Sequence, residues 1–243
     1  FFSFCSDAAP SGKRGSKAAV FRARVLNCAV LLAQGSSREA IGRLEELLSA
    51  APEDGRCEVI RYLSLACFRV GETARCEELT MEGLRLLGEK TPTCSALYIF
   101  RQRLAFCAAG IFRRQKPLSG ERLRRAQAAL FFWGSMARLY GPKSFYLFLC
   151  AVLRMRTLSA KYFGVSADRA SSDMALAGAL MTSRRFRMSL RYLRSALRTM
   201  KDSGNEWETA HIGQLMGTLH LWRGNNAGAE ADLLDAADRF EAI

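Results

Sequence analysis

The sequence predicts an all-α protein built from antiparallel helices, and three observations support this fold class. Turn-rich breaks recur along the 243 residues, and the stretches between them carry apolar residues at helical spacing. No stretch alternates polar and apolar residues as a half-buried strand would. Only five prolines interrupt the chain, so long helices are permitted throughout. We therefore expect about eleven helices joined by short links, each antiparallel to the next.

The breaks place these helices in order along the chain. Residues 1–16 are expected to be irregular, and residues 17–91 to form two helical hairpins. Residues 92–165 are expected to hold a basic helix near 93–113 and a less regular pair near 120–139 and 143–163. Residues 166–243 are expected to form two more hairpins.

Residues 186–201 show the helical pattern most plainly. Their apolar residues are spaced by 4, 3, 4 and 3 positions: Phe186, Leu190, Leu193, Leu197 and Met200. This spacing places all of them on one face of a helix. The stretch is therefore expected to pack that face against its neighbours.

Small or slim residues recur with a fixed spacing in four pairs of these helices. In each pair, steps of 12 and 7 residues separate three positions, and only Leu47 among them is large: Cys28, Ala40 and Leu47; Ser64, Cys76 and Gly83; Ala177, Ser189 and Ala196; Gly217, Ala229 and Ala236. A break lies within each 12-residue step, so the first residue is on one helix and the other two are on the next. Antiparallel helices approach to about 8 to 10 Å where the side chains at their crossing are small. These residues are therefore predicted to form the helix crossings.

The spacing resembles the tetratricopeptide repeat, a helix–turn–helix unit of about 34 residues with small residues at the crossing. The first unit carries the most of that pattern, with Gly35, Ala40, Leu44 and Pro52. A glycine precedes the second helix in three of the four units: Gly35, Gly71 and Gly224. The resemblance implies an α-solenoid with a right-handed superhelix, in which the first helix of each unit lines the concave side.

The second half has a more specific resemblance. "LRRAQAALFFWGSMARLYGPKSFYLFLCAVLRMRTLSAKYFGVSADRASSDMALAGALM", "FRMSLRYLRSALRTMKDSGNEWETAHIGQLMGTLHLWRGN" and the entry "SGNEWETA" into the last unit are similar to the helical-repeat region of large bacterial signalling proteins. Those proteins are built around a predicted ATPase of the AAA/STAND type and often carry a kinase or cyclase domain. The resemblance implies that this chain is a non-catalytic repeat segment of such a protein, and that any ATPase or kinase lies outside it. A cytoplasmic location is expected because the longest uncharged run, residues 209–222, is too short to span a bilayer.

The net charge of +13 is concentrated in the centre of the chain. Residues 90–161 contain 14 basic residues and one acid, whereas the flanking stretches are neutral. The basic patch predicted from this region includes Arg113, Arg114, Lys116, Arg122, Arg124 and Arg125. An acidic neighbouring domain is the plainest partner for these residues. A nucleic-acid-binding regulatory module, using residues 93–161, is the alternative.

A second basic feature follows one face of residues 184–201. Its members are spaced by three and four residues and include Arg187, Arg191, Arg194 and Arg198. Such a stripe is expected to be a solvated helix face with arginine stems covering apolar surface. We expect the acidic residues of 202–241 to neutralise it, although an acidic partner or nucleic acid would also fit.

The sequence shows no catalytic, cofactor-binding or metal-binding constellation. The stretch "GLRLLGEKT" misses the phosphate-binding loop pattern because Glu89 separates Gly88 from Lys90. His211 and His220 are nine residues apart, about 900° around a helix, which places them on opposite faces. The eight cysteines have no paired zinc spacing.

We therefore expect a non-catalytic scaffold that binds a protein or peptide partner, or neighbouring domains of its own chain, without a membrane span. Counted from the small residue of each unit, seven exposed positions are expected on the concave side: Arg22, Glu58, Arg61, Met174, Met181, His211 and Gln214. These side chains are the predicted partner-binding residues.

Overall fold

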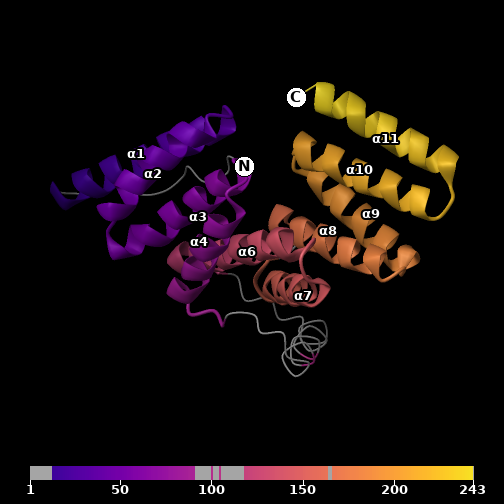
Figure 1. The fold of residues 1–243 in the computed structure, drawn as a ribbon, viewed down its shortest axis with the longest axis horizontal. Coiled ribbons are helices and arrows are strands. Elements are labelled where there is room, and N and C mark those ends of the chain that lie inside the picture. Colours follow the sequence, from indigo (N-terminus) through magenta and orange to yellow (C-terminus); the bar gives the residue numbers. More distant parts are fainter. Residues whose placement is uncertain (1–12, 91–99, 101–103, 105–117, 164–165, 243) are drawn as a thin grey trace. The chain divides into compact units, whose positions relative to one another are not determined.

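The structure is a computed structural model that describes residues 13–90, 100, 104, 118–163 and 166–242. These residues contain ten long α-helices and no β-strand, so the chain is all-α with consecutive helices packed together, as predicted (Figure 1). The basic helix expected near 93–113 lies outside the described residues, apart from Phe100 and Leu104. The chain divides into two compact units, Phe1–Gly88 and Glu89–Ile243, which we call unit 1 and unit 2.

Unit 1 consists of two helical hairpins. Its four helices are α1 (Lys13–Ala33), α2 (Ser37–Ser49), α3 (Glu53–Arg69) and α4 (Thr73–Leu86). Helix α1 begins at Lys13, so residues 13–16, which were expected to be irregular, are helical, and the rest of the segment expected over 1–16 lies outside the described residues. The helices pack in chain order, and α1 also contacts α3.

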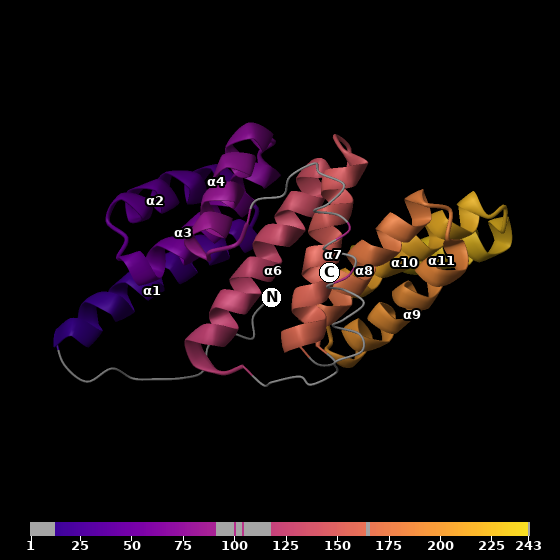
Figure 2. The same cartoon turned by 90° about the horizontal axis from the view of Figure 1, so that it is seen from below.

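Unit 2 contains three consecutive hairpins, which Figure 2 shows from a second direction. Its helices are α6 (Gly120–Tyr140), α7 (Phe145–Tyr162), α8 (Ala167–Thr182), α9 (Phe186–Asp202), α10 (Glu206–Trp222) and α11 (Asn226–Glu241). Side-chain oxygens cap the start of four of these helices by accepting a backbone N–H: Ser144, Ser166, Asn205 and Asn225. The central pair α6–α7 contacts α8 and belongs to the same unit as the last two hairpins.

The small residues at the predicted crossings are all buried. Every one of the twelve positions with the 12-and-7 spacing is buried, from Cys28 in α1 to Ala236 in α11. At the α8–α9 crossing the Ser189 hydroxyl donates to the carbonyl oxygen of Ala177 over 2.8 Å. At the α10–α11 crossing a Cβ added to Gly217 would lie 2.6 Å from Cγ of Leu233. Helix approach at these points therefore depends on the size of the side chain.

The turn inside each of the four regular hairpins has one geometry. Seven residues after the first small residue, the chain adopts a positive φ at Gly35 (84°), Gly71 (84°), Arg184 (56°) and Gly224 (73°). At each of these turns two backbone N–H groups return to carbonyl oxygens of the preceding helix, as in Arg184 to Met181 and Arg185 to Leu180. The third hairpin therefore makes the same left-handed turn without glycine.

Large aromatic residues replace the small ones in the central hairpin. Phe132 and Trp133 of α6 are fully buried. The indole N–H of Trp133 donates to Oε2 of Glu89 over 3.2 Å. Arg154 of α7 donates to both carboxylate oxygens of Glu89, over 2.8 and 2.9 Å. One carboxylate thus joins the start of unit 2 to two of its helices.

None of the helices in the described part of the chain is long and apolar enough to cross a membrane. The longest uncharged run, residues 209–222, lies in α10, where Ala210, Ile212 and Leu219 form part of the core.

Candidate interaction surfaces

In each unit the first helices of successive hairpins lie side by side, and the second helices do not. In unit 1, α1 packs against α3, while α2 and α4 meet only through side chains, as in the Arg75–Glu45 ion pair. In unit 2, α8 packs against both α6 and α10, while the backbones of α7, α9 and α11 lie apart and Arg156 of α7 reaches the Tyr192 ring of α9 through its side chain. The side formed by the first helices is therefore the inner side of each unit's curvature, which we call its inner face. The side formed by the second helices is its outer face.

Six of the seven residues expected on the concave side are at least partly accessible. Arg22, Glu58 and Gln214 are exposed, and Arg61, Met174 and His211 are partly buried. Met181 was expected to be exposed, but this expectation is wrong because it is only 5% exposed. It lies in the core cluster with Leu190 and Leu193 of α9, whose side chains cover the end of α8.

The inner face of α10 presents more apolar surface than the sequence analysis identified. Leu221 and Trp222 are 49% and 55% exposed. Leu221 is seven residues, or two helical turns, beyond Gln214 and therefore lies on the same face. The partly buried Thr218 lies between them. This spacing is visible in the sequence and could have identified Leu221 and its neighbour Trp222.

An aromatic cluster lies near the start of α10. The Trp207 ring centroid is 5.3 Å from that of His211 and 6.2 Å from that of Phe240 in α11. Trp207 is 52% exposed. His211 Nδ1 is 3.8 Å from a carboxylate oxygen of Glu208. The histidine therefore has an aromatic ring and an acid of the preceding turn as neighbours at one end of the inner face.

The predicted basic residues are exposed wherever the structure describes them. Arg122, Arg124 and Arg125 lie in the first turns of α6, and Arg187, Arg191, Arg194 and Arg198 lie along α9. The predicted members Arg113, Arg114 and Lys116 lie outside the described residues. The α9 arginines and the three α6 arginines belong to different helices of unit 2 and form separate groups in the chain.

The acids of residues 202–241 do not neutralise the α9 stripe, contrary to the sequence-based expectation. Arg239 forms ion pairs with two of these acids, with its Nη1 2.9 Å from Glu206 and its Nε 3.0 Å from Asp235. Asp232 lies 3.6 Å from Nε2 of His220. These contacts are between α10 and α11 or within α11, so the stripe keeps its positive charge on the outer face.

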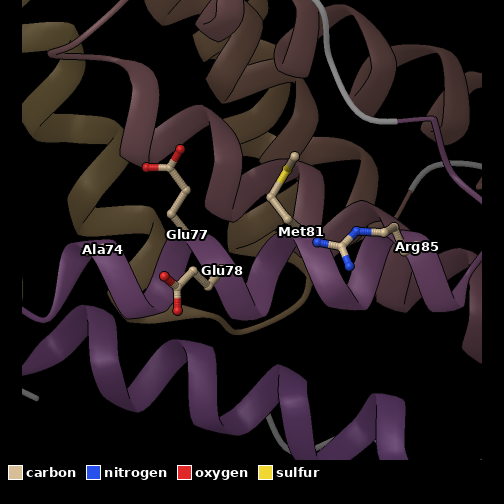
Figure 3. Close-up of a pocket in the computed structure, with 5 residues that line it drawn as sticks. All are labelled: Ala74, Glu77, Glu78, Met81 and Arg85. Atoms are coloured by element: carbon tan, nitrogen blue, oxygen red, sulfur yellow. The ribbon is translucent and has the colours of Figure 1, made fainter.

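The hollows of unit 1 are shallow and open. One is lined only by residues of α4, and Figure 3 shows them on consecutive turns with Glu77 and Met81 on the same side of the helix. The other lies between α2, α3 and α4, where Arg75 pairs with Glu45. Its wall also contains Arg56, which pairs with Glu82 over 2.8 Å, so both cations are paired and this second hollow does not offer an unpaired charge to an anion.

An ion pair between α7 and α8 is buried within unit 2. Nε of Arg156 lies 3.0 Å from Oδ1 of Asp173, and the two side chains are 9% and 7% exposed. The Arg156 guanidinium also lies over the Tyr192 ring of α9, 5.8 Å from its centroid. Burial raises the pKa of Asp173 and lowers the pKa of Arg156, and in each case it outweighs the opposing effect of the partner's charge. The pair joins three helices and is closed to solvent, so we regard it as part of the scaffold.

The described residues contain no group of three or more His, Cys, Asp or Glu side chains that could hold a metal ion. Burial raises the pKa of the Cys67 thiol to about 11 and also raises the pKa of Cys28. Both thiols therefore stay protonated near neutral pH and act as small apolar side chains of the crossings and core.

Comparison with known proteins adds little beyond the fold. No protein-family model matches the chain, and no curated protein sequence is similar to it. Among solved structures the chain is similar to the crystal structure of BtubC (BKLC) from P. vanneervenii, at 15% sequence identity and a TM-score of 0.48. The match covers 92% of this chain and 81% of that one. Similarity at this level says nothing about what this chain binds or does.

Proposed function

We propose that the chain is a non-catalytic scaffold that binds a protein or peptide partner, or a neighbouring domain of its own polypeptide, on the inner face of unit 2. The observation that carries this proposal is the side-by-side packing of the first helices. It brings the accessible side chains of α6, α8 and α10 onto one face.

The inner face of α10 has a composition suited to a peptide. Gln214 offers both amide donors and a carbonyl acceptor, which can hydrogen-bond to the main chain of a bound segment. Leu221 and Trp222 are about half exposed and can cover an apolar side chain of the partner. Aromatic residues at such positions supply much of the binding free energy in protein interfaces. We therefore expect the partner to carry an apolar anchor flanked by hydrogen-bonding main chain.

We further propose that this scaffold is the repeat region of a larger bacterial signalling protein and works in the cytoplasm. The support is the resemblance of residues 120–241, above all "SGNEWETA" at the entry to α10, to the repeat regions of proteins with an AAA/STAND-type predicted ATPase. In that setting the inner face would restrain or recruit the ATPase or its output domain.

Site-specific photo-crosslinking tests the binding face directly. A benzophenone amino acid is placed at Gln214 on the inner face, and at Glu46 on α2 as a matched exposed control, in the full-length protein within its own cells. We expect discrete crosslinked products from position 214 and none of the same mass from position 46. If both positions give the same products, or position 214 gives none, the inner face is not the binding surface.

Nucleic-acid binding through the basic centre is the second candidate. It is favoured by Arg122, Arg124 and Arg125, which are exposed and form no ion pair within the described part of the chain. The neighbouring Phe132 and Trp133 are fully buried, so they do not provide a stacking surface for bases. If this candidate is right, affinity for a short duplex falls steeply with salt and is lost in the triple variant R122Q/R124Q/R125Q. Negligible binding at low salt would eliminate it.

A further inference from the structure

The outer face of unit 2 carries an unpaired basic helix. Arg187, Arg191, Arg194, Arg198 and Lys201 are all exposed on α9. Within the described residues, none of their charged groups reaches a carboxylate; the side-chain hydrogen bond recorded among them runs from Nε of Arg198 to the carbonyl oxygen of Arg194, at 3.4 Å. They extend over fifteen residues of helix, a length of about 21 Å.

The next outer helix, α11, carries the opposite charge. Glu230, Asp235, Asp238 and Glu241 are exposed, and Glu230, Asp238 and Glu241 have no ion pair among the described residues. Leu234 lies among these acids and is 58% exposed. The acids extend over twelve residues of helix, about 16 Å, so the two charged surfaces have similar lengths.

The positions of these two helices allow the basic and the acidic surface to pair with opposite charges in a single interface. Helices α9 and α11 are the second helices of successive hairpins, and both pack against α10 while their own backbones stay apart. If two copies meet through this outer face around a two-fold axis, α9 of each copy lies against α11 of the other. The dimer interface then contains the pairing of the basic α9 with the acidic α11 twice. We infer that the partner of this face is a second copy of the chain, in an antiparallel dimer formed by α9 and α11.

Apolar side chains at the same surface support a protein partner. Met188 on α9 and Leu234 on α11 are 46% and 58% exposed, and such side chains supply the desolvated contact that exposed charge pairs alone do not. A nucleic acid fits this face less well because its phosphates would meet the acids of α11 beside the arginines of α9. A partner that carries both signs of charge fits both helices.

This dimer surface is separate from the inner face assigned to the partner in the proposed function. Photo-crosslinking from Gln214 therefore tests the scaffold proposal whatever the state of the outer face. Conversely, the experiments below can fail while the inner face still binds its partner.

Charge reversal provides the test, using sedimentation velocity on the full chain at about 0.1 mM protein and an ionic strength of about 0.05 M, where exposed charges are weakly screened. We expect the unmodified chain to dimerise, and the dimer to weaken at least tenfold at an ionic strength of about 0.5 M. The variant R191E/R194E leaves three of the five basic side chains of the α9 stripe and sets two acids against the acids of α11, and E230R/D238R sets two arginines against the arginines of α9, so each variant alone should be monomeric. Their equimolar mixture should restore the dimer, because one half of the interface then keeps the original pairing of α9 with α11 and the other half pairs the introduced acids with the introduced arginines.

The control variant R124E/R125E reverses the same number of charges on α6 and should dimerise like the unmodified chain. Far-ultraviolet circular dichroism verifies that every variant keeps its helix content. The inference is overturned by a monomeric unmodified chain at low salt, by a dimer that survives both reversals, or by a mixture that stays monomeric. Salt-dependent binding of a twenty-base-pair duplex that is lost in R191E/R194E, with the unmodified chain monomeric, would assign the stripe to nucleic acid instead.

Discussion

Arg156 and Asp173 form an ion pair that is buried between α7 and α8, with 3.0 Å between Nε and Oδ1. Beside it, the hydroxyl groups of Ser159 and Ser172 are 2.7 Å apart in a hydrogen bond between the same helices. Charged and polar contacts thus replace apolar ones where α7 of the central hairpin packs against α8 of the next hairpin. The cost of removing two charges from water offsets most of the attraction between them. The pair therefore contributes little to the free energy of unfolding, and its main effect is to determine which parts of α7 and α8 pack together.

Removing one partner of this pair should be far more harmful than removing both. We expect Asp173→Ala to lower the free energy of unfolding by about 3 to 5 kcal/mol, because it leaves the Arg156 charge buried and unpaired. The double variant R156M/D173L should be neutral or more stable by about 1 to 4 kcal/mol. Urea unfolding followed by circular dichroism measures both values.

The exposed pair Arg43–Glu39 provides the control for burial, since both of its side chains are 51% exposed. Glu39→Ala should change the free energy of unfolding by less than about 1 kcal/mol. If the double variant at 156 and 173 is as unstable as Asp173→Ala, the ion pair itself stabilises unit 2. The instability of Asp173→Ala would then not come from leaving the Arg156 charge unpaired.

The pH dependence of stability should report the burial of Asp173. Its pKa is raised by desolvation, so the folded chain binds a proton at this carboxyl more readily than the unfolded chain does. The contribution of Asp173 to the free energy of unfolding should therefore increase as the pH falls through the raised pKa toward the ordinary value of about 3.9, and decrease as the pH rises again.

The difference between the unmodified chain and Asp173→Asn isolates this contribution from that of other carboxyl groups. We expect that difference, measured by urea unfolding at a series of pH values from about 7 to about 4, to favour the unmodified chain increasingly at lower pH. A difference that moves the other way would mean that the Arg156 charge, and not desolvation, governs the carboxyl.

The left-handed turn at Arg184 should be a source of instability that glycine removes. A non-glycine residue with φ of 56° carries a steric cost that glycine avoids. We expect Arg184→Gly to raise the free energy of unfolding by about 1 kcal/mol, and Arg184→Asn to raise it by less, since asparagine tolerates this region better than arginine. Thermal unfolding in parallel with Gly71→Ala, which should destabilise by a similar amount, checks that the effect belongs to the turn geometry.

The repeat was predictable because its signal is local and periodic. A small side chain is required wherever two helices cross closely, and the 12-and-7 spacing from Gly217 to Ala229 and Ala236 repeats that requirement in four units. The same geometry fixes the turn seven residues after the first small residue. Three glycines revealed that turn in the sequence, and only the arginine at position 184 concealed the fourth.

Contacts between charged residues on different helices were not predictable in the same way. Glu89 and Arg154 are 65 residues apart, and nothing in the spacing of either shows that the rotation of α7 brings them together. The outer-face arginines were expected to be neutralised by acids that in fact pair with Arg239 and His220. The net charge of a segment shows whether acidic or basic residues are in excess. Which of them form ion pairs depends on which helices pack together and on which faces they present.

Accessibility on the inner face was partly predictable. Helical spacing from the small residues identified Gln214 and His211, but it also selected Met181, which the side chains of α9 cover. The position of a residue on one helix does not show how far the neighbouring helix extends over it. The last turn of α10 is not covered in this way, which leaves Leu221 and Trp222 accessible.

Neighbouring helices nest because the side chains at their crossings are small, and a matched pair of glycine variants tests this most directly. At Gly217 a new Cβ would meet Leu233 Cγ at 2.6 Å and the Ala229 carbonyl oxygen at 3.2 Å, whereas a new Cβ at Gly178, also in a first helix, would meet nothing within 4 Å. Urea unfolding should show that Gly217→Ala loses about 1 to 3 kcal/mol, through overpacking at the α10–α11 crossing. Gly178→Ala should gain about 0.5 to 1 kcal/mol from the higher helix propensity of alanine. Equal effects of the two substitutions, or a gain at Gly217, would contradict the proposed crossings.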